Sequence, residues 1–208
     1  MAAPARFLSD VGATGGRPLH TIVTIRPETR RRRSIRLQDY DYALAGAYFI
    51  TMVTQDRKCL FGEVVDGEIK LNDCGQTVQD EWEKSAQIRK EIELDAFVVM
   101  PNHVHGIVVI TDRMGRATGR SSLQSGPAKR SLGAFVSGFK SVVTKRINAF
   151  QGLPGTPVWQ RNYFEHVIRD ENSLNRIRQY VLDNPARWEF DRENPATLKP
   201  ESDYTWRQ

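Results

Sequence analysis

The residues of this chain best suited to chemistry are two histidines separated by one valine, His103-Val104-His105. They lie in residues 98–110, the most apolar run of the sequence. In a β-strand, residues i and i+2 project from one face about 6–7 Å apart, so both imidazoles would point together while Val104 faces the other way. Such a pair offers two nitrogen ligands to a metal ion. Two histidines sharing ordinary hydrogen bonds on a polar sheet face are the alternative, and spacing alone does not decide between them.

A second set of reactive side chains lies near the end of a predicted helix. Tyr180 and Asn184 are four residues apart and share one helical face if the helix reaches that far. A phenol with a pKa of about 10 is a poor nucleophile, but it becomes usable beside a metal-polarised phosphate. The amide oxygen of Asn184 would then be a third ligand. A half-buried helix tyrosine and a polar residue before Pro185 are the alternatives, and proline disfavours the α conformation in the residue before it.

Hydrophobic patterning predicts the elements that must position these residues. The expected order is strand, hairpin, helix, two paired strands, helix, strand, helix. Few of the connections resemble repeated crossover units, so we predict an α+β fold with helices packed on a mostly antiparallel sheet. The break between the two paired strands, at Pro101-Asn102, could be a turn or a bulge, and Ser173 could N-cap the last helix. The expected elements cover residues 48–54, 60–65 and 68–71 around an Asp66-Gly67 turn, 77–86, 94–100, 103–110, 132–150, 158–167 and 174–182.

Positive charge is segregated along the chain. Of 208 residues 39% are hydrophobic and 26% charged, with a formal net charge of +5. Residues 1–36 hold eight arginines against two acidic residues, and residues 112–150 hold eight basic residues against one. Segregated basic segments indicate a polyanion such as nucleic acid, although a solvated arm without a partner is the alternative. We expect three parts: a basic, disordered arm over 1–36, a domain over 37–190 with a flexible linker at 112–130, and a tail over 191–208.

Targeting signals and cysteine pairs are lacking in the sequence. No apolar run approaches the ~20 residues that span a membrane, and the first residues lack the apolar core of a secretory signal. Cys59 and Cys74 form no Cys-x-x-Cys pair, which suits a reducing compartment. We therefore expect a cytoplasmic protein without a membrane partner.

Two strings together resemble a known family. Met100-Pro101-Asn102-His103-Val104-His105 is followed about 75 residues later by Arg178-Gln179-Tyr180-Val181-Leu182-Asp183-Asn184-Pro185. The combination resembles the single-tyrosine HUH transposases, and most closely the REP-associated tyrosine transposases. Further matching text includes residues 46–51 and 159–169, so that the resemblance covers roughly residues 35–190.

This resemblance implies a ferredoxin-like fold with the histidine pair on a central strand. It implies Mg²⁺ or Mn²⁺ held by His103, His105 and Asn184, and Tyr180 as the nucleophile. Attack on single-stranded DNA beside a hairpin formed by a palindromic repeat would leave a 5′-phosphotyrosine link and a free 3′-OH. Two imidazoles alone suit zinc, nickel or manganese better than magnesium, which needs oxygen ligands such as phosphate and water. Relatives act as monomers or as homodimers that exchange tyrosines, and the sequence favours neither.

The basic residues expected to contact DNA phosphates come from both basic segments and from the second string of matching text. They are Arg30, Arg31, Arg32, Arg33, Lys140, Lys145, Arg146 and Arg161. Two other functions remain open at this stage. One is a non-cleaving protein that binds hairpin nucleic acid, for instance a domesticated regulator. The other is a metal-dependent hydrolase that uses water, for which the sequence carries no supporting carboxylate motif.

Overall fold

The computed structural model describes residues 44–111, 130–198 and 200. The arm over residues 1–36, with Arg30, Arg31, Arg32 and Arg33, therefore lies outside the described residues, as do most of the 112–130 linker and the last part of the tail. Helices and strands follow the predicted order. The strands are β1 (Gly46–Val53), β2 (Gly62–Val65), β3 (Glu68–Leu71), β4 (Ile92–Val99), β5 (His103–Ile110) and β6 (Phe164–Ile168). The helices are α1 (Asp73–Ile88), α2 (Leu132–Gln151) and α3 (Glu171–Asp183), with short 3₁₀ turns at Gln55–Arg57 and Pro185–Phe190.

Four strands form one antiparallel sheet in the order β4-β5-β1-β6. Helix α1 connects β1 to β4, a tight turn connects β4 to β5, and α2 precedes β6. This βαββαβ path with its two central strands β5 and β1 is the ferredoxin-like topology, so the predicted fold class is confirmed. The β2–β3 hairpin is a separate two-stranded sheet inserted before α1. Its turn residues Asp66 and Gly67 both have positive φ (53° and 78°), as the predicted Asp-Gly turn requires.

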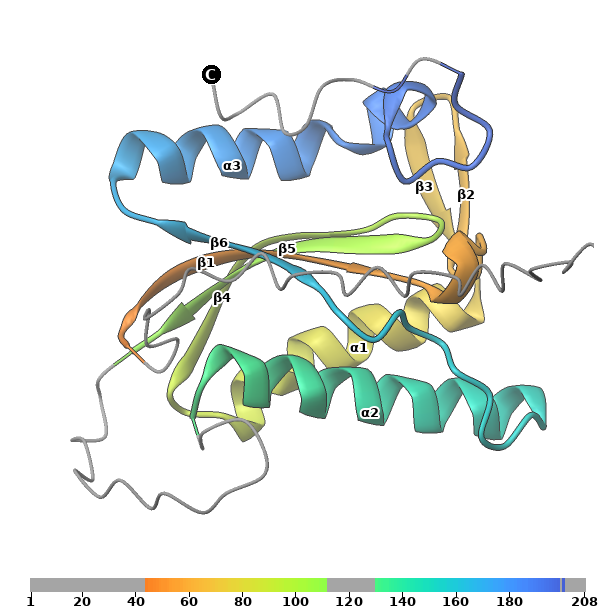
Figure 1. Ribbon diagram of the computed structural model, residues 1–208, viewed down its shortest axis with the longest axis horizontal. Coiled ribbons are helices and arrows are strands. Elements are labelled where there is room, and N and C mark those ends of the chain that lie inside the picture. Colours follow the sequence, from red (N-terminus) through yellow and green to blue (C-terminus); the bar gives the residue numbers. More distant parts are fainter. Residues whose placement is uncertain (1–43, 112–129, 199, 201–208) are drawn as a thin grey trace, which may run out of the picture. The chain divides into compact units, whose positions relative to one another are not determined.

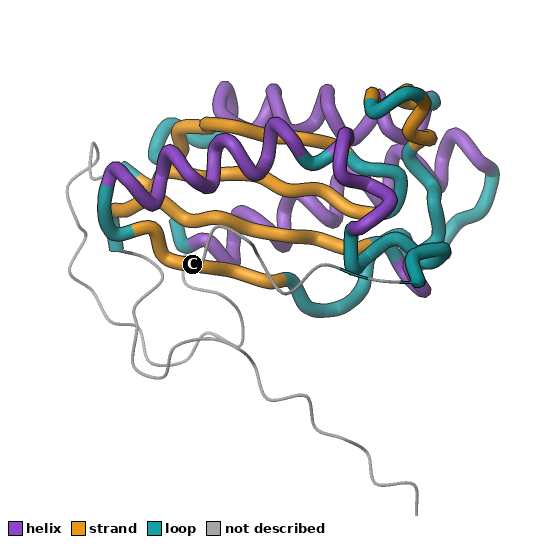
Figure 2. The backbone as a smooth tube through the Cα atoms, turned by 90° about the horizontal axis from the view of Figure 1, so that it is seen from above, coloured by secondary structure: helices purple, strands orange, loops and turns teal. Residues whose placement is uncertain are grey.

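Helices cover both faces of the main sheet. In Figure 1, α1 and α2 lie against one face and α3 lies against the other. Figure 2 looks onto the sheet from the α3 side and shows that helix running along the near face. The larger core cluster fills the α1–α2 side, where Val104 and Val108 of β5 point. A smaller cluster lies under α3 and includes Phe49, Ile107, Ile177 and Val181.

Gly106 lies between these two layers of side chains, at the centre of β5. A Cβ atom there would stand 2.5 Å from the indole ring of Trp82, which lies on α1 and stacks on Phe97. Only glycine lets α1 approach the sheet this closely. The strand that carries the histidine pair is thereby pressed against the helix layer on the opposite face.

Several local expectations need correction or sharpening. Asp170, not Ser173, is the N-cap of α3: its side chain accepts a hydrogen bond from the Ser173 backbone N–H. The helix therefore begins at Glu171, three residues before the predicted start. The Pro101-Asn102 break is a turn between antiparallel strands, closed by a hydrogen bond from Met100 N–H to the His103 carbonyl. Among the described residues, no helix has the length and apolarity needed to cross a membrane.

Candidate active site

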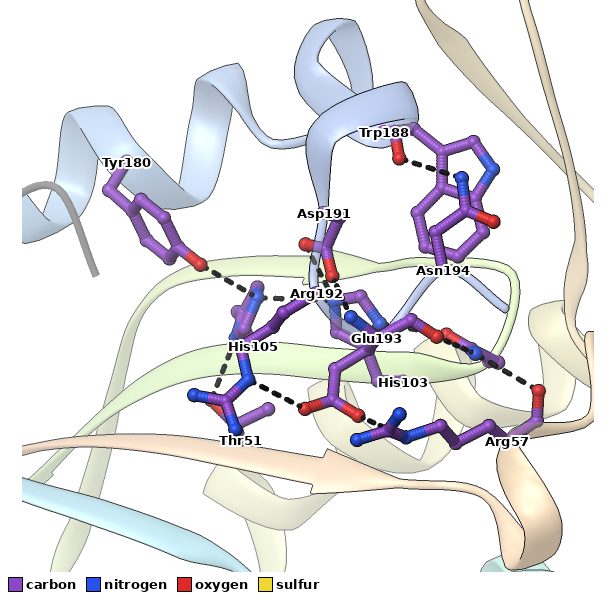
Figure 3. Close-up of polar contacts among 11 residues, drawn as sticks. Thr51, Arg57, His103, His105, Tyr180, Trp188, Asp191, Arg192, Glu193 and Asn194 are labelled. Carbon is purple, nitrogen blue, oxygen red and sulfur yellow. Dashed lines mark hydrogen bonds and ion pairs between the residues drawn. The ribbon is translucent and has the colours of Figure 1, made fainter. Parts of the chain in front are cut away.

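His103 and His105 lie together at the α3 side of β5. Both are buried, with 0% and 2% of their surface exposed, and their Nε2 atoms are 3.1 Å apart. Val104 between them belongs to the opposite core cluster, as the two-residue period of the strand predicts. Figure 3 shows the two rings side by side with Tyr180 and Asp191 beside them. The sequence prediction of a two-pronged histidine pair on a central strand is confirmed.

Each ring is oriented by a hydrogen bond at Nδ1. Asn102 donates its amide N–H groups to the carbonyls of Arg57 (3.0 Å) and Glu193 (2.6 Å), so its Oδ1 faces His103 as an acceptor. His103 therefore donates from Nδ1 at 2.9 Å and keeps a lone pair on Nε2. Thr51 lies on the adjacent strand β1, and its hydroxyl is 2.8 Å from Nδ1 of His105. When this hydroxyl accepts the bond, His105 also presents a lone pair at Nε2.

Burial keeps both imidazoles in their neutral form. It lowers the pKa of His103, although the carboxylates of Asp191 and Glu193 act in the opposite direction. Burial and the neighbouring His103 hold the pKa of His105 well below its usual range. Two neutral rings whose lone pairs converge are the state in which histidine binds a metal.

Tyr180 reaches the pair from α3. Its hydroxyl lies 3.4 Å from Nε2 of His105, and its ring packs edge-on against Phe49 of β1 at 6.0 Å. Ile177 and Val181 of α3 are fully buried between the helix and the sheet, and they fix the rotation of the helix about its axis. The phenol oxygen is thus presented to the histidines of its own chain.

Asn184 is the C-cap of α3 and is buried with 4% of its surface exposed. Its backbone is α-helical (φ −58°, ψ −40°), which corrects the expectation drawn from Pro185. The correction has a local reason, because Pro185 starts a 3₁₀ turn and the Asn184 carbonyl accepts a hydrogen bond from Arg187 N–H in that turn. The side-chain Oδ1 is buried and makes no hydrogen bond of normal geometry, yet it lies close enough to His103 to raise the pKa of that ring.

Asp191 is a further residue of the site that the sequence did not reveal. Its Oδ2 lies 3.8 Å from Nε2 of His103, and its side chain is only 6% exposed. One ligand atom from each of His103, His105 and Asp191 lies within 4.8 Å of the other two. Nothing in the sequence around Asp191 signals this position, because it follows a 3₁₀ turn whose direction depends on long-range contacts.

These donors suit a divalent cation. Two imidazole nitrogens, one carboxylate oxygen and one amide oxygen lie close together here, and the Tyr180 hydroxyl lies 3.4 Å from one of those nitrogens. A buried arrangement of acceptors is unfavourable unless a cation joins it. His103, His105 and Asp191 could therefore hold a metal ion, with Asn184 beside them.

Only part of the predicted DNA-contact set lies at this end of the sheet. Gln160 N–H bonds to the carbonyl of Val53, the residue paired with His103, and the exposed Arg161 follows it in the chain. Arg30, Arg31, Arg32 and Arg33 lie outside the described residues, and the other three predicted residues lie on α2, which covers the opposite face. Lys140 donates to the carbonyls of Gln160 and Asn162, Arg146 pairs with Glu81 of α1 at 2.5 Å, and Lys145 is exposed.

No known family model matches the chain. An uncharacterized protein of Haemophilus influenzae is 38% identical over 169 residues, which are 77% of this chain and 91% of the relative. A second protein of the same organism, provisionally named a REP-associated tyrosine transposase, is 22% identical over 71% of this chain and 74% of its own.

Solved structures with some likeness include two transposases. One is a REP-associated tyrosine transposase bound to a REP hairpin, with a TM-score of 0.47, 20% identity and 74% of both chains covered. The other is a provisionally assigned transposase from Deinococcus radiodurans R1, with a TM-score of 0.42, 20% identity, and 71% and 95% coverage.

A ferredoxin-like sheet that brings a His-x-His pair together with a helix tyrosine is the architecture expected from the transposase resemblance. The chain is similar to a protein provisionally named a REP-associated tyrosine transposase. It belongs to the same protein family as the uncharacterized Haemophilus influenzae protein, with which it shares 38% identity.

Proposed function

We propose that this protein is a DNA strand-transferase that cleaves and rejoins single-stranded DNA beside a hairpin formed by a palindromic repeat. The observation that carries the proposal is the 3.4 Å approach of the Tyr180 hydroxyl to the buried His103–His105 pair. Tyr180 would be the nucleophile, and His103, His105 and Asn184 would hold Mg²⁺ or Mn²⁺. The substrate class comes from the transposase resemblance and from the basic segments.

In the proposed reaction the Tyr180 oxygen attacks the phosphorus of one phosphodiester. The new O–P bond replaces the bond to the 3′ oxygen. The fragment on the 3′ side of the break is then joined to Tyr180 through its 5′ phosphate, and the fragment on the 5′ side ends in a 3′-OH. The phenol loses one proton and the leaving 3′ oxygen gains one, which balances the step. A bound divalent cation would stabilise the developing charge on the phosphate oxygens. Attack by a 3′-OH on the ester reverses the chemistry, so strands rejoin without an external energy source.

The chain's own residues supply orientation. Phe49 sets the Tyr180 ring at an angle of 82° to its own, while Ile177 and Val181 keep the helix seated on the sheet. Thr51 and Asn102 hold the imidazoles in one orientation each. Such preorganisation brings nucleophile and phosphate site together before the substrate binds.

The decisive experiment is capture of the covalent intermediate. Full-length protein is incubated with Mn²⁺ and labelled oligonucleotides that carry a hairpin next to single-stranded flanks, and denaturing gels are searched for a protein–DNA adduct. Wild type is expected to form the adduct, Tyr180→Phe to lose it, and Tyr163→Phe to retain it, because Tyr163 contacts Lys140 on the α2 side. An adduct that persists in Tyr180→Phe contradicts the proposal. Hairpin binding with no adduct in wild type would instead identify a non-cleaving binder, and products with a free 5′-phosphate and no protein link would identify a hydrolase.

A further inference from the structure

We propose that Asp191 is a ligand of the same divalent cation, so that a carboxylate from the segment after α3 completes the metal site. The inference rests on the proposed function in one respect, because it assumes that His103 and His105 bind a metal. It goes beyond that function by adding a charged oxygen ligand from outside the helix and strand that carry the matching motifs.

The backbone after α3 is built to bring Asp191 back over the histidines. The 3₁₀ turn at Pro185–Phe190 reverses the chain, and Asp191 N–H closes it by bonding to the Trp188 carbonyl at 3.1 Å. The Asn194 side chain donates to that same carbonyl at 2.9 Å. Figure 3 shows Trp188 and Asn194 beside each other and the Asp191 carboxylate directed at the imidazoles.

A second anchor links this segment to the histidine pair. The Glu193 carbonyl accepts a hydrogen bond from Asn102, the residue that also orients His103. The Glu193 carboxylate pairs with Arg57 at 2.9 Å and with Arg192 at 3.3 Å, so two arginines face its charge. Asn102 therefore fixes the ring of His103 and the position of Asp191 at once.

The Asp191 carboxylate has one oxygen engaged and one directed at the histidines. Oδ1 accepts a hydrogen bond from Glu193 N–H at 2.6 Å, whereas Oδ2 faces Nε2 of His103 at 3.8 Å. His103 is a basic side chain within ion-pair distance of this carboxylate. His103 already donates through Nδ1, so a neutral ring offers Asp191 a lone pair and not a proton. A cation between the two groups resolves this mismatch.

The spacing of the ligand atoms fits one ion. At a ligand distance of about 2.1 Å, donors in neighbouring octahedral positions are about 3.0 Å apart and donors in opposite positions about 4.2 Å apart. The observed separations of 3.1 Å between the two Nε2 atoms and 3.8 Å to Asp191 lie within that range. The buried Oδ1 of Asn184 lies close enough to raise the pKa of His103 and is a further oxygen that could bind the same cation.

The carboxylate changes which ion the site prefers. Two imidazoles alone favour zinc or nickel, whereas added carboxylate and amide oxygens favour Mn²⁺ and Mg²⁺. Four protein ligands would leave two positions of an octahedron for phosphate oxygen or water. The chain thus carries its own oxygen ligands and would bind Mn²⁺ before DNA arrives.

The test measures Mn²⁺ binding by the full chain in the absence of DNA. Free Mn²⁺ is followed by electron paramagnetic resonance in wild type, Asp191→Asn and Asp183→Asn, the last being an exposed carboxylate at the end of α3. Asp191→Asn is expected to weaken Mn²⁺ binding at least tenfold and Asp183→Asn less than twofold. Asp191→Glu, which keeps a carboxylate, is expected to bind more tightly than Asp191→Asn, and circular dichroism establishes that each variant is folded.

Several outcomes overturn this inference without touching the proposed reaction. Mn²⁺ affinity in folded Asp191→Asn within twofold of wild type would do so. Unchanged Mn²⁺ affinity with faster adduct formation would show that the carboxylate occupies the place of a substrate phosphate. Conversely, wild type that binds Mn²⁺ through Asp191 but never forms an adduct would refute the proposed strand transfer and leave the ligand assignment intact.

Discussion

Arg178 and Asp95 form a two-pronged ion pair that ties the tyrosine-bearing helix α3 to the edge strand β4. The guanidinium Nε lies 2.9 Å from Oδ1 and Nη2 lies 2.7 Å from Oδ2. Asp95 occupies an irregularity of β4 between Leu94 and Phe97, which shifts the register of the strand. The irregularity therefore turns this carboxylate toward α3. There it meets Arg178, which lies two residues before Tyr180.

Removing this pair should misplace Tyr180, the proposed nucleophile, more than it destabilises the fold. For Arg178→Ala we expect a loss of about 0.5–1 kcal/mol, because the pair is partly exposed, and a fall in Tm of about 2–4 °C. The rate of adduct formation should fall about tenfold or more, since small displacements of a reacting group are costly. Arg176→Ala on the exposed side of α3 is the control, and the double variant with the two charges exchanged should recover part of the rate. Equal rates for Arg176→Ala and Arg178→Ala would contradict the positioning role.

The same pair gives a pH dependence of stability. Hydrogen bonds from Arg178 lower the pKa of the Asp95 carboxyl. A carboxyl whose pKa is lower in the folded state stabilises the protein above its unfolded pKa, about 3.9, and loses that contribution as the pH falls through the folded value. In urea titrations, the difference in unfolding free energy between wild type and Asp95→Asn should be largest near neutrality and shrink in acid. A difference that grows on acidification would show the opposite linkage.

Thr51→Val should loosen His105 without removing a metal ligand. Valine keeps the shape of threonine but cannot bond to Nδ1 of His105, 2.8 Å from the hydroxyl. Loss of such an outer partner typically weakens metal binding roughly 10–100-fold. Isothermal titration with Mn²⁺ should show this loss, whereas Thr54→Val, whose hydroxyl bonds to the Lys58 carbonyl, should bind as wild type does. Unchanged affinity in Thr51→Val would mean that packing alone orients the ring.

Lys140 should make the protein more stable as the pH rises from 8 to 10. Burial lowers its pKa to about 8, whereas in the unfolded chain the value is about 10.4. Between these values the folded form has lost the proton and the unfolded form keeps it, so unfolding takes up a proton and higher pH favours the folded state. Relative to Lys140→Met, wild type should gain at most about 1.4 kcal/mol per pH unit in this window. Urea unfolding of wild type and Lys140→Met at pH 7.5 and 9.5 would measure this slope.

The parts of the site with a local signature could be predicted from the sequence. Residues 103–110 match β5 end to end, because a segment rich in β-branched residues favours a strand, and the two-residue period of a strand places both histidines on one face. Tyr180 was located by its place on an amphipathic helix and by the motif around it. The Asp66-Gly67 turn was predictable because its backbone conformation has few suitable residue types.

The long-range contacts that complete the site have no local signature in the sequence. Asp191 reaches His103 only because Asn102 holds the Glu193 carbonyl, across 91 residues of sequence. Asp95 faces α3 only because β4 is irregular at that point, and a periodic pattern does not contain such a shift. Asn184 takes a helical conformation before proline because the following turn compensates it, which a rule about pairs of neighbours does not capture.

The order in which the site's parts occur along the chain has a consequence during synthesis. His105 and its reactive neighbour Tyr180 are 75 residues apart, and Asp191 follows later still. At about 5–20 residues per second, a ribosome needs roughly 4–15 s to pass from the codon of His105 to that of Tyr180. Throughout that interval the nascent chain displays a histidine pair but lacks the proposed nucleophile. Under the proposed function, such a chain could not cleave DNA until Tyr180 has been translated.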